Sequence, residues 1–176
     1  MSTDCTTNPG SDNPHGVVNP PSLIFSLPVS SVAASKTFYS TIGGSVAPFA
    51  PIPQYGDDKT VSFRLPDPNG NACVMLHSPE RFAEFMRADA KAVVDATKTT
   101  EVIISLSCTK KEDVDGWLER VVAAGGKADP YTMKDYGAFC GMYVRSWTDP
   151  DGHVWECVAM IGMPDCVAAK AAETKE

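Results

Sequence analysis

Alternating apolar and polar positions predict β-strands in both halves of the chain. Phe25, Leu27 and Val29 form one face of a strand over 23–29, because successive side chains of a strand point to opposite faces. The same reasoning predicts further strands over 45–49, 60–65, 71–77, 101–107, 127–129, 143–147 and 153–160. Apolar positions spaced three and four residues apart predict helices over about 31–42, 79–86 and 110–124.

One turn signal occurs twice. Asp67–Gly70 (Asp-Pro-Asn-Gly) and Asp149–Gly152 (Asp-Pro-Asp-Gly) are tight-turn tetrapeptides, each followed by an apolar strand, and they lie 82 residues apart. The pairs Gly43-Gly44 and Gly125-Gly126 end the two longer predicted helices and are separated by the same 82 residues. Two independent markers at one separation indicate an internal duplication of a β-α-β-β-β unit.

The residues of both units carry a family resemblance. Leu27-Pro28-Val29, followed by a helix that contains Phe38-Tyr39 and ends in Gly43-Gly44, resembles the opening of a glyoxalase/bleomycin-resistance protein. The second unit is similar through Ala123-Ala124-Gly125-Gly126 and the segment Asp149–Glu156. The resemblance to the vicinal oxygen chelate superfamily covers about residues 22–161.

Within that superfamily, the chain most resembles the subgroup labelled "predicted lactoylglutathione lyase". The residues that carry this are Val74-Met75-Leu76 followed by Phe82, and Ser105-Leu106-Ser107. The resemblance implies an α+β fold. Two tandem βαβββ modules form a curled, half-open, barrel-like sheet around a cavity, with the helices outside.

The composition divides the chain into a single domain with two tails. Residues 1–21 are rich in Ser, Thr, Asn, Pro and Gly and are expected to form a disordered leader. Module one is expected over 22–86 and module two over 100–161 of one domain, and residues 162–176 form a flexible tail.

The resemblance also implies a divalent metal, because enzymes of the superfamily bind one through two positions in each module. By register, these positions fall on Glu101 and Glu156 in the second module, but on Ile24 and Val74 in the first. His77 is the candidate for a third ligand, although strand alternation places it on the face opposite to Val74. The implied zinc, nickel, manganese or iron site is therefore incomplete.

The same positions supply the candidate catalytic groups. Glu156 is expected in mid-strand between Val154 and Val158, where a buried carboxylate costs free energy unless it is paired or used. If Glu101 faces Glu156, one of the two carboxylates titrates high and serves as a general base. The side chains expected to line the cavity are Ile24, Ser26, Val74, Ser105 and Tyr143, with Tyr136 and Arg145 as further candidates.

Charge and cysteine content narrow the class of protein. The formal net charge is −7 and no Lys/Arg-rich run occurs, which argues against a nucleic-acid partner. No apolar run has the length of a membrane span. The six cysteines show no Cys-x-x-Cys pairing, as expected for free thiols in a cytoplasmic protein. The resemblance adds a small-molecule ligand or substrate and a homodimer.

Two functions remain open at this point. The paired glutamates favour a glyoxalase-like lyase or isomerase that is assisted by a divalent metal. The missing metal ligands favour a non-catalytic protein that binds and sequesters a small molecule, of the bleomycin-resistance type. An extradiol dioxygenase-type iron enzyme ranks last, because it requires two histidines and one carboxylate and the ligand positions hold no histidine.

Overall fold

The chain folds into two successive sets of strands and helices. The computed structural model describes residues 21–90, 92–131 and 141–162. The first set comprises β1 (Leu23–Pro28), α1 (Val32–Ile42), β2 (Ala50–Pro51), the 3-10 turn η1 (Pro53–Tyr55), β3 (Thr60–Arg64), β4 (Ala72–His77) and α2 (Pro79–Ala83). The second set comprises β5 (Ile103–Cys108), α3 (Lys111–Ala123), β6 (Lys127–Ala128), β7 (Met142–Thr148) and β8 (Val154–Met160).

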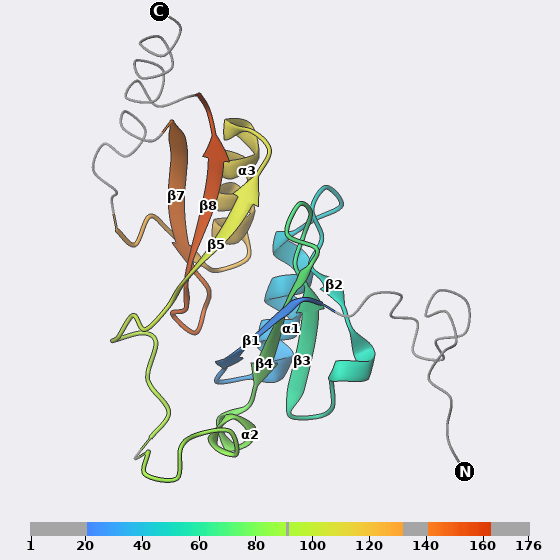
Figure 1. Cartoon of the computed structure of the whole chain (residues 1–176), viewed down its shortest axis with the longest axis vertical. Helices are drawn as coiled ribbons and strands as arrows, with labels where there is room; N and C mark the ends of the chain where they lie inside the picture. Colours follow the sequence, from blue (N-terminus) through green and yellow to red (C-terminus); the bar gives the residue numbers. More distant parts are fainter. Residues whose placement is uncertain (1–20, 91, 132–140, 163–176) are drawn as a thin grey trace, which may run out of the picture.

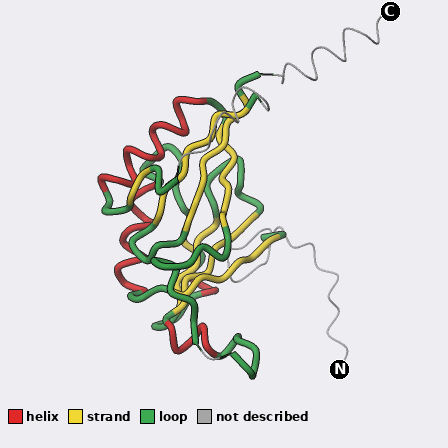
Figure 2. Tube along the Cα trace, turned by 90° about the vertical axis from the view of Figure 1, so that its left-hand side faces the viewer, coloured by secondary structure: helices red, strands yellow, loops and turns green. Residues whose placement is uncertain are grey.

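Each set forms a four-stranded mixed sheet with the same strand order. The orders are β1-β4-β3-β2 and β5-β8-β7-β6, and the first strand of each set runs parallel to the last. Figures 1 and 2 show α1 and α3 on one side of the two sheets. The α+β fold of two βαβββ modules is therefore confirmed, as an open pair of curled sheets in the described part of the chain.

Serine residues cap the starts of α1 and α2. The Ser31 hydroxyl accepts a hydrogen bond from the Ala34 N–H at 3.3 Å and starts α1. Ser78 caps α2 in the same way, and Pro79 occupies its first position. One expected strand is wrong: residues 45–49 are not a strand, and β2 covers only Ala50–Pro51. Pro48 has no N–H to donate to a ladder there.

A cluster of aromatic rings fills the space between the helices and the sheets. Trp147 and Trp155 lie opposite each other on β7 and β8 and stack, with ring centroids 5.2 Å apart and planes 6° apart. Tyr39 of α1 packs against Trp155 at 5.9 Å, and Phe49 packs against Trp117 of α3 at 5.8 Å. All five rings are buried. The two modules therefore share one hydrophobic core.

The two Asp-Pro turns connect the modules. Asp149 accepts the Tyr39 hydroxyl at 2.7 Å, and Asp151 accepts the Ser30 N–H at 2.7 Å. In return, the Asn69 side chain accepts the Ser107 N–H at 2.9 Å and donates to the Ser107 carbonyl at 3.0 Å. Each turn thus contacts the opposite module rather than lying on a free surface.

The two hairpins differ by one residue in register. A shift of 82 residues relates Ser146 to Arg64 and Glu156 to Val74. Ser146 lies opposite Glu156, but Arg64 lies opposite Cys73. Because a slip of one residue exchanges the faces of a strand, Val74 points into the core, where it is fully buried. The expectation that Val74 occupies a metal position and lines the cavity is wrong.

The helices of the structure bear on whether the chain could cross a membrane. Among residues 21–90, 92–131 and 141–162, no helix is both long enough and apolar enough to cross a bilayer.

Candidate functional site

A cavity of about 920 Å³ lies where β1, β5 and the connection between the modules meet. We call it the large cavity. The apolar side chains in its wall include Phe25, Leu27, Met86, Val93, Val94 and Ile103. Ser26 of β1 and Ser105 of β5 add hydroxyl groups to the same wall. The cavity is therefore mostly apolar, with a few polar groups from both modules.

Glu156 does not line the cavity itself, but it is hydrogen-bonded to Ser105, which does. Its Oε2 accepts the Ser105 hydroxyl at 2.8 Å, and its Oε1 accepts the Tyr131 hydroxyl at 2.5 Å. Burial and the Glu156 carboxylate raise the pKa of Tyr131, so this phenol remains a proton donor. The half-buried carboxylate is thereby held by two hydroxyl donors.

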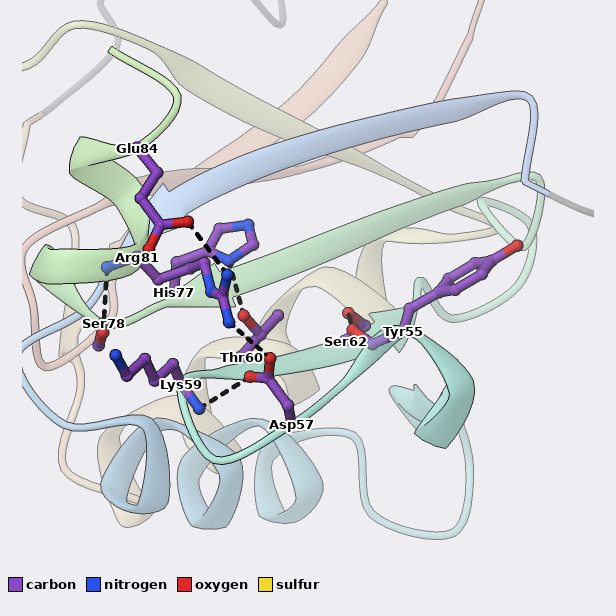
Figure 3. Close-up of polar contacts among 9 residues, drawn as sticks. All are labelled: Tyr55, Asp57, Lys59, Thr60, Ser62, His77, Ser78, Arg81 and Glu84. Atoms are coloured by element: carbon purple, nitrogen blue, oxygen red, sulfur yellow. Dashed lines mark hydrogen bonds and ion pairs between the residues drawn. The ribbon is translucent and has the colours of Figure 1, made fainter.

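His77 makes a similar contact in the first module, although the residue directly opposite Ser26 is Met75. Its Nε2 lies 3.2 Å from Ser26 Oγ, and its Nδ1 lies 2.9 Å from Thr60 Oγ1. Figure 3 shows the ring above Thr60 at the end of β4. His77 is only 2% exposed, and burial, followed by the nearby Arg81, lowers its pKa. Ser26 and His77 are separated by 51 residues, as are Ser105 and Glu156.

Glu101 lies at the surface of the second module. It is exposed, precedes the first residue of β5 and borders the large cavity. Within the described part of the chain, no hydrogen bond joins the two carboxylates. Glu156 is held by Ser105 and Tyr131 instead, and a pairing of the two glutamates stays a prediction.

The donor set does not fit the metal site that the family resemblance implies. In residues 21–90, 92–131 and 141–162, no group of three or more His, Cys, Asp or Glu side chains could hold a metal ion. On the face of the first sheet that carries Ser26, β1 and β4 also present Ile24, Met75 and His77; on the face of the second sheet that carries Glu156, β5 presents Ile103 and Ser105. His77 and Glu156 are therefore single potential ligands on separate sheets, and the isoleucines and the Met75 thioether beside them are poor ligands for the hard or borderline divalent metals.

Tyr143 lies on the helix side of its sheet. Its hydroxyl donates to Asp115 of α3 at 2.8 Å, and Arg145 binds the same carboxylate at 3.0 Å and Asp129 at 2.6 Å. The Tyr143 hydroxyl and then Arg145 lower the pKa of Asp115. The expectation that Tyr143 lines the cavity is therefore wrong, and Arg145 has a role in tying β7 to α3. Tyr136 lies outside the described residues.

Sequence reasoning missed two contributors to these sites. Tyr131 precedes β7 in a loop with no pattern that indicates a partner for Glu156. Val93 and Val94, in the connection between the modules, also line the large cavity. Two adjacent valines in an otherwise polar stretch were the sequence signal that could have indicated this contact.

The comparisons with known proteins are consistent with this architecture. A family model for the Glyoxalase/Bleomycin resistance protein/Dioxygenase superfamily matches residues 23–157. No curated protein shows significant similarity to the chain.

Several solved structures share the fold at low identity. A hypothetical protein from S. aureus is 24% identical over 77% of this chain and 90% of its own, with a TM-score of 0.59. A glyoxalase-related enzyme from Fulvimarina pelagi is 20% identical over 78% of this chain and 86% of its own, at 0.57. A lactoylglutathione lyase from Agrobacterium tumefaciens is 18% identical over 80% and 96%, at 0.54.

Proposed function

Because the chain belongs to the glyoxalase/bleomycin resistance protein/dioxygenase superfamily, we propose that it is a small-molecule binding protein. Its ligand is predominantly apolar and occupies the large cavity. The observation that carries the proposal is the cavity itself, with a volume of about 920 Å³ and apolar walls from both modules. Ligand sites of this size and composition are typical of proteins that enclose one small organic molecule.

The walls supply both affinity and orientation for such a ligand. Val94 and Ile103 are 45% and 46% exposed, so a bound molecule removes apolar surface from water at both positions. Each Å² of apolar surface buried stabilises the complex by roughly 25 cal/mol. The Ser26 and Ser105 hydroxyls can accept or donate hydrogen bonds, which favours a ligand with one or two neutral polar atoms.

Binding is favoured over metal-assisted catalysis because of the donor set. A glyoxalase-like lyase or isomerase of the implied type requires a divalent metal held by several ligands. In the described residues no three His, Cys, Asp or Glu side chains are grouped so as to hold an ion, and this donor set does not fit that metal. The homodimer implied by the family resemblance and the cytoplasmic location inferred from the cysteines stay predictions.

The contacts of Glu156 favour a second candidate, an acid–base enzyme that transfers a proton. The Tyr131 and Ser105 hydroxyls hold the carboxylate at the cavity wall. A substrate that displaces the Ser105 hydroxyl brings a C–H group beside a carbonyl to Glu156 Oε2. Glu156 would then act as the general base, and the exposed Glu101 at the cavity border would be the second titratable group.

A fluorescent probe tests the binding function. N-phenyl-1-naphthylamine is neutral and apolar, and we expect its fluorescence to rise saturably with the wild-type protein. Val94→Trp fills part of the cavity and should weaken binding at least about fivefold, the equivalent of roughly 1 kcal/mol. Val46→Trp is the matched control, because Val46 is 83% exposed and lies outside the cavity wall. Equal affinity in all three proteins would overturn the proposal.

Proton exchange tests the second candidate. Hydroxyacetone in deuterated buffer should exchange its C–H protons faster with wild-type protein than with Glu156→Gln. Tyr131→Phe should slow the exchange less than Glu156→Gln, because the base itself remains. Exchange at the buffer rate with wild-type protein, or at the same rate with Glu156→Gln, would exclude the enzyme for this substrate class.

A further inference from the structure

Residues 92–100, in the connection between the modules, form part of the wall of the large cavity. We call this segment the strap. Figure 1 shows it between α2 and β5, where the structure has neither helix nor strand. The strap residues in the wall are Ala92, Val93, Val94, Ala96, Thr99 and Thr100. On this side the cavity is therefore bounded by an irregular segment rather than by a sheet.

The polar contacts of the strap are made within the strap itself. The Asp95 carboxylate accepts the Thr97 N–H at 3.0 Å and pairs with the Lys98 ammonium at 2.8 Å. The Asp95 carbonyl accepts the N–H groups of Lys98 and Thr99 at 3.0 and 3.1 Å. Over the described parts of both modules, no hydrogen bond or ion pair reaches the strap. The strap is thus a self-contained turn without a polar tie to the surface beneath it.

The strap rests on the second Asp-Pro turn through a close backbone contact. A Cβ added to Gly152 would lie 2.7 Å from the Thr97 nitrogen and 2.8 Å from the Ala96 carbonyl carbon. Both distances are too short for atoms that are not bonded to each other. The strap therefore reaches this position only because residue 152 has no side chain.

Burial also holds the strap weakly. None of residues 92–100 is buried; Val94 is 45% exposed, and the Lys98 side chain is 79% exposed. A segment with few buried apolar contacts and no hydrogen bonds to its surroundings opens at a much smaller free-energy cost than the whole fold. A ligand in the cavity changes this balance, because it gives Val93 and Val94 an apolar surface on which to pack.

We propose that the strap is the gate of the large cavity. It moves away from Gly152 to admit the ligand, and it packs on the ligand once the cavity is filled. This inference rests on the proposed binding function, because the gate admits the ligand of that cavity. Ligand binding then slows the opening of the strap, and a side chain that pushes the strap away from Gly152 speeds both entry and exit.

Hydrogen exchange measured by mass spectrometry tests the opening of the strap in the wild-type protein. Without a ligand, the strap amides should exchange at least about tenfold faster than those of β8, which lies inside its sheet. Saturating N-phenyl-1-naphthylamine should slow the strap amides at least about fivefold. Residues 53–59, which lie outside the cavity wall, should be unaffected. Equal slowing in both segments, or none in the strap, would overturn the gate.

Two glycine variants test the gate through its kinetics. In Gly152→Ala the new methyl group displaces the strap, so the association and dissociation rates of N-phenyl-1-naphthylamine should both rise at least about threefold in stopped-flow fluorescence. Gly125→Ala is the matched control, because Gly125 has a similar φ, +99° against +93°, and an added Cβ there meets no atom within 4 Å. Its rates should equal those of the wild type. Equal rates in all three proteins would overturn the gate.

The outcomes distinguish a failure of the gate from a failure of the proposed function. If N-phenyl-1-naphthylamine does not bind saturably to the wild-type protein, the binding function fails and the gate fails with it. If the probe binds saturably but the strap is not protected, the gate alone is overturned and the cavity fills through another opening. Hydrogen exchange of the wild-type protein decides this even if Gly152→Ala does not fold.

Discussion

Ser26 Oγ of β1 contacts His77 Nε2 of β4 at 3.2 Å, across two parallel strands. In the second module Ser105 of β5 contacts Glu156 of β8 at 2.8 Å, and here the two residues lie directly opposite each other, whereas Ser26 lies opposite Met75. In each module a serine in the cavity wall is backed by one titratable side chain. The duplicated fold therefore places a histidine behind one hydroxyl and a carboxylate behind the other.

The buried histidine should make the protein less stable in mild acid. The pKa of His77 is lowered from its usual 6.5 in the folded state, so below pH 6.5 the unfolded chain binds a proton that the folded chain does not. Stability then falls by up to about 1.4 kcal/mol per pH unit until the folded pKa is reached. Urea unfolding midpoints at pH 7.5, 6.5 and 5.5 measure this. His77→Phe should flatten the slope, and an unchanged slope would refute the explanation.

The carboxyl of Asp149 should be replaceable by an amide but not by a methyl group. Burial raises its pKa, so its neutral form is favoured relative to an exposed aspartate. One oxygen accepts the Asp151 and His153 N–H groups, and the other accepts the Tyr39 hydroxyl. Asp149→Asn keeps the first oxygen and should cost less than about 1 kcal/mol. Asp149→Ala leaves these three donors without their acceptor and should lower the free energy of unfolding by about 2–4 kcal/mol.

Chemical denaturation at pH 7 of the two Asp149 variants provides the measurement. Similar losses for the amide and the methyl variant would mean that the negative charge, rather than the acceptor geometry, holds the turn against α1.

Gly152 should be harder to replace than Gly125. Both have a positive φ, +93° and +99°, where an alanine costs about 1 kcal/mol in backbone strain. At Gly125 an added Cβ meets no atom within 4 Å, whereas at Gly152 it would lie 2.7 Å from the Thr97 nitrogen. Gly125→Ala should lower Tm by about 2–4 °C and Gly152→Ala by at least twice as much. Equal shifts would show that the connection does not pack on the turn.

The corrected register of β4 predicts opposite results at two neighbouring positions. Val74→Asp buries a carboxylate in the core and should abolish or severely reduce folding, by more than about 4 kcal/mol. Met75→Asp places the same group on the open face, where Met75 is half-exposed, and should cost less than about 1 kcal/mol. Circular dichroism and thermal unfolding distinguish the two. A reversal of the ranking would restore the register expected from the 82-residue repeat.

Much of the fold was predictable because its signals are local. The Asp-Pro turns, the caps at Ser31 and Ser78 and the alternation in the strands each depend on a few adjacent residues. The same locality explains the error at Val74. The repeat fixes where each turn lies, but the pairing between β3 and β4 decides which face a residue occupies, and one residue of slip is invisible in the spacing of turns.

The candidate site was less predictable because its contacts join distant segments. Glu156 was identified from its place in a strand, but its donor Tyr131 comes from a loop without a pattern. His77 was expected to face away from the ligand positions only because Val74 was placed on the wrong face. Glu101 lies before β5 rather than within it, since the strand begins at Ile103. Such relationships require the three-dimensional pairing of strands.

The reciprocal turns have a consequence for how the chain behaves when it is divided. Asn69 completes the edge of β5, and Asp149 and Asp151 hold α1 and the end of β1. A fragment that ends near residue 90 would lack the acceptors for Tyr39 and Ser30, while its complement would lack Asn69. Each fragment alone is therefore expected to be unstable, and mixing the two should restore a folded complex. An ancestral half-length polypeptide would have met the same requirement only by pairing with another copy of itself.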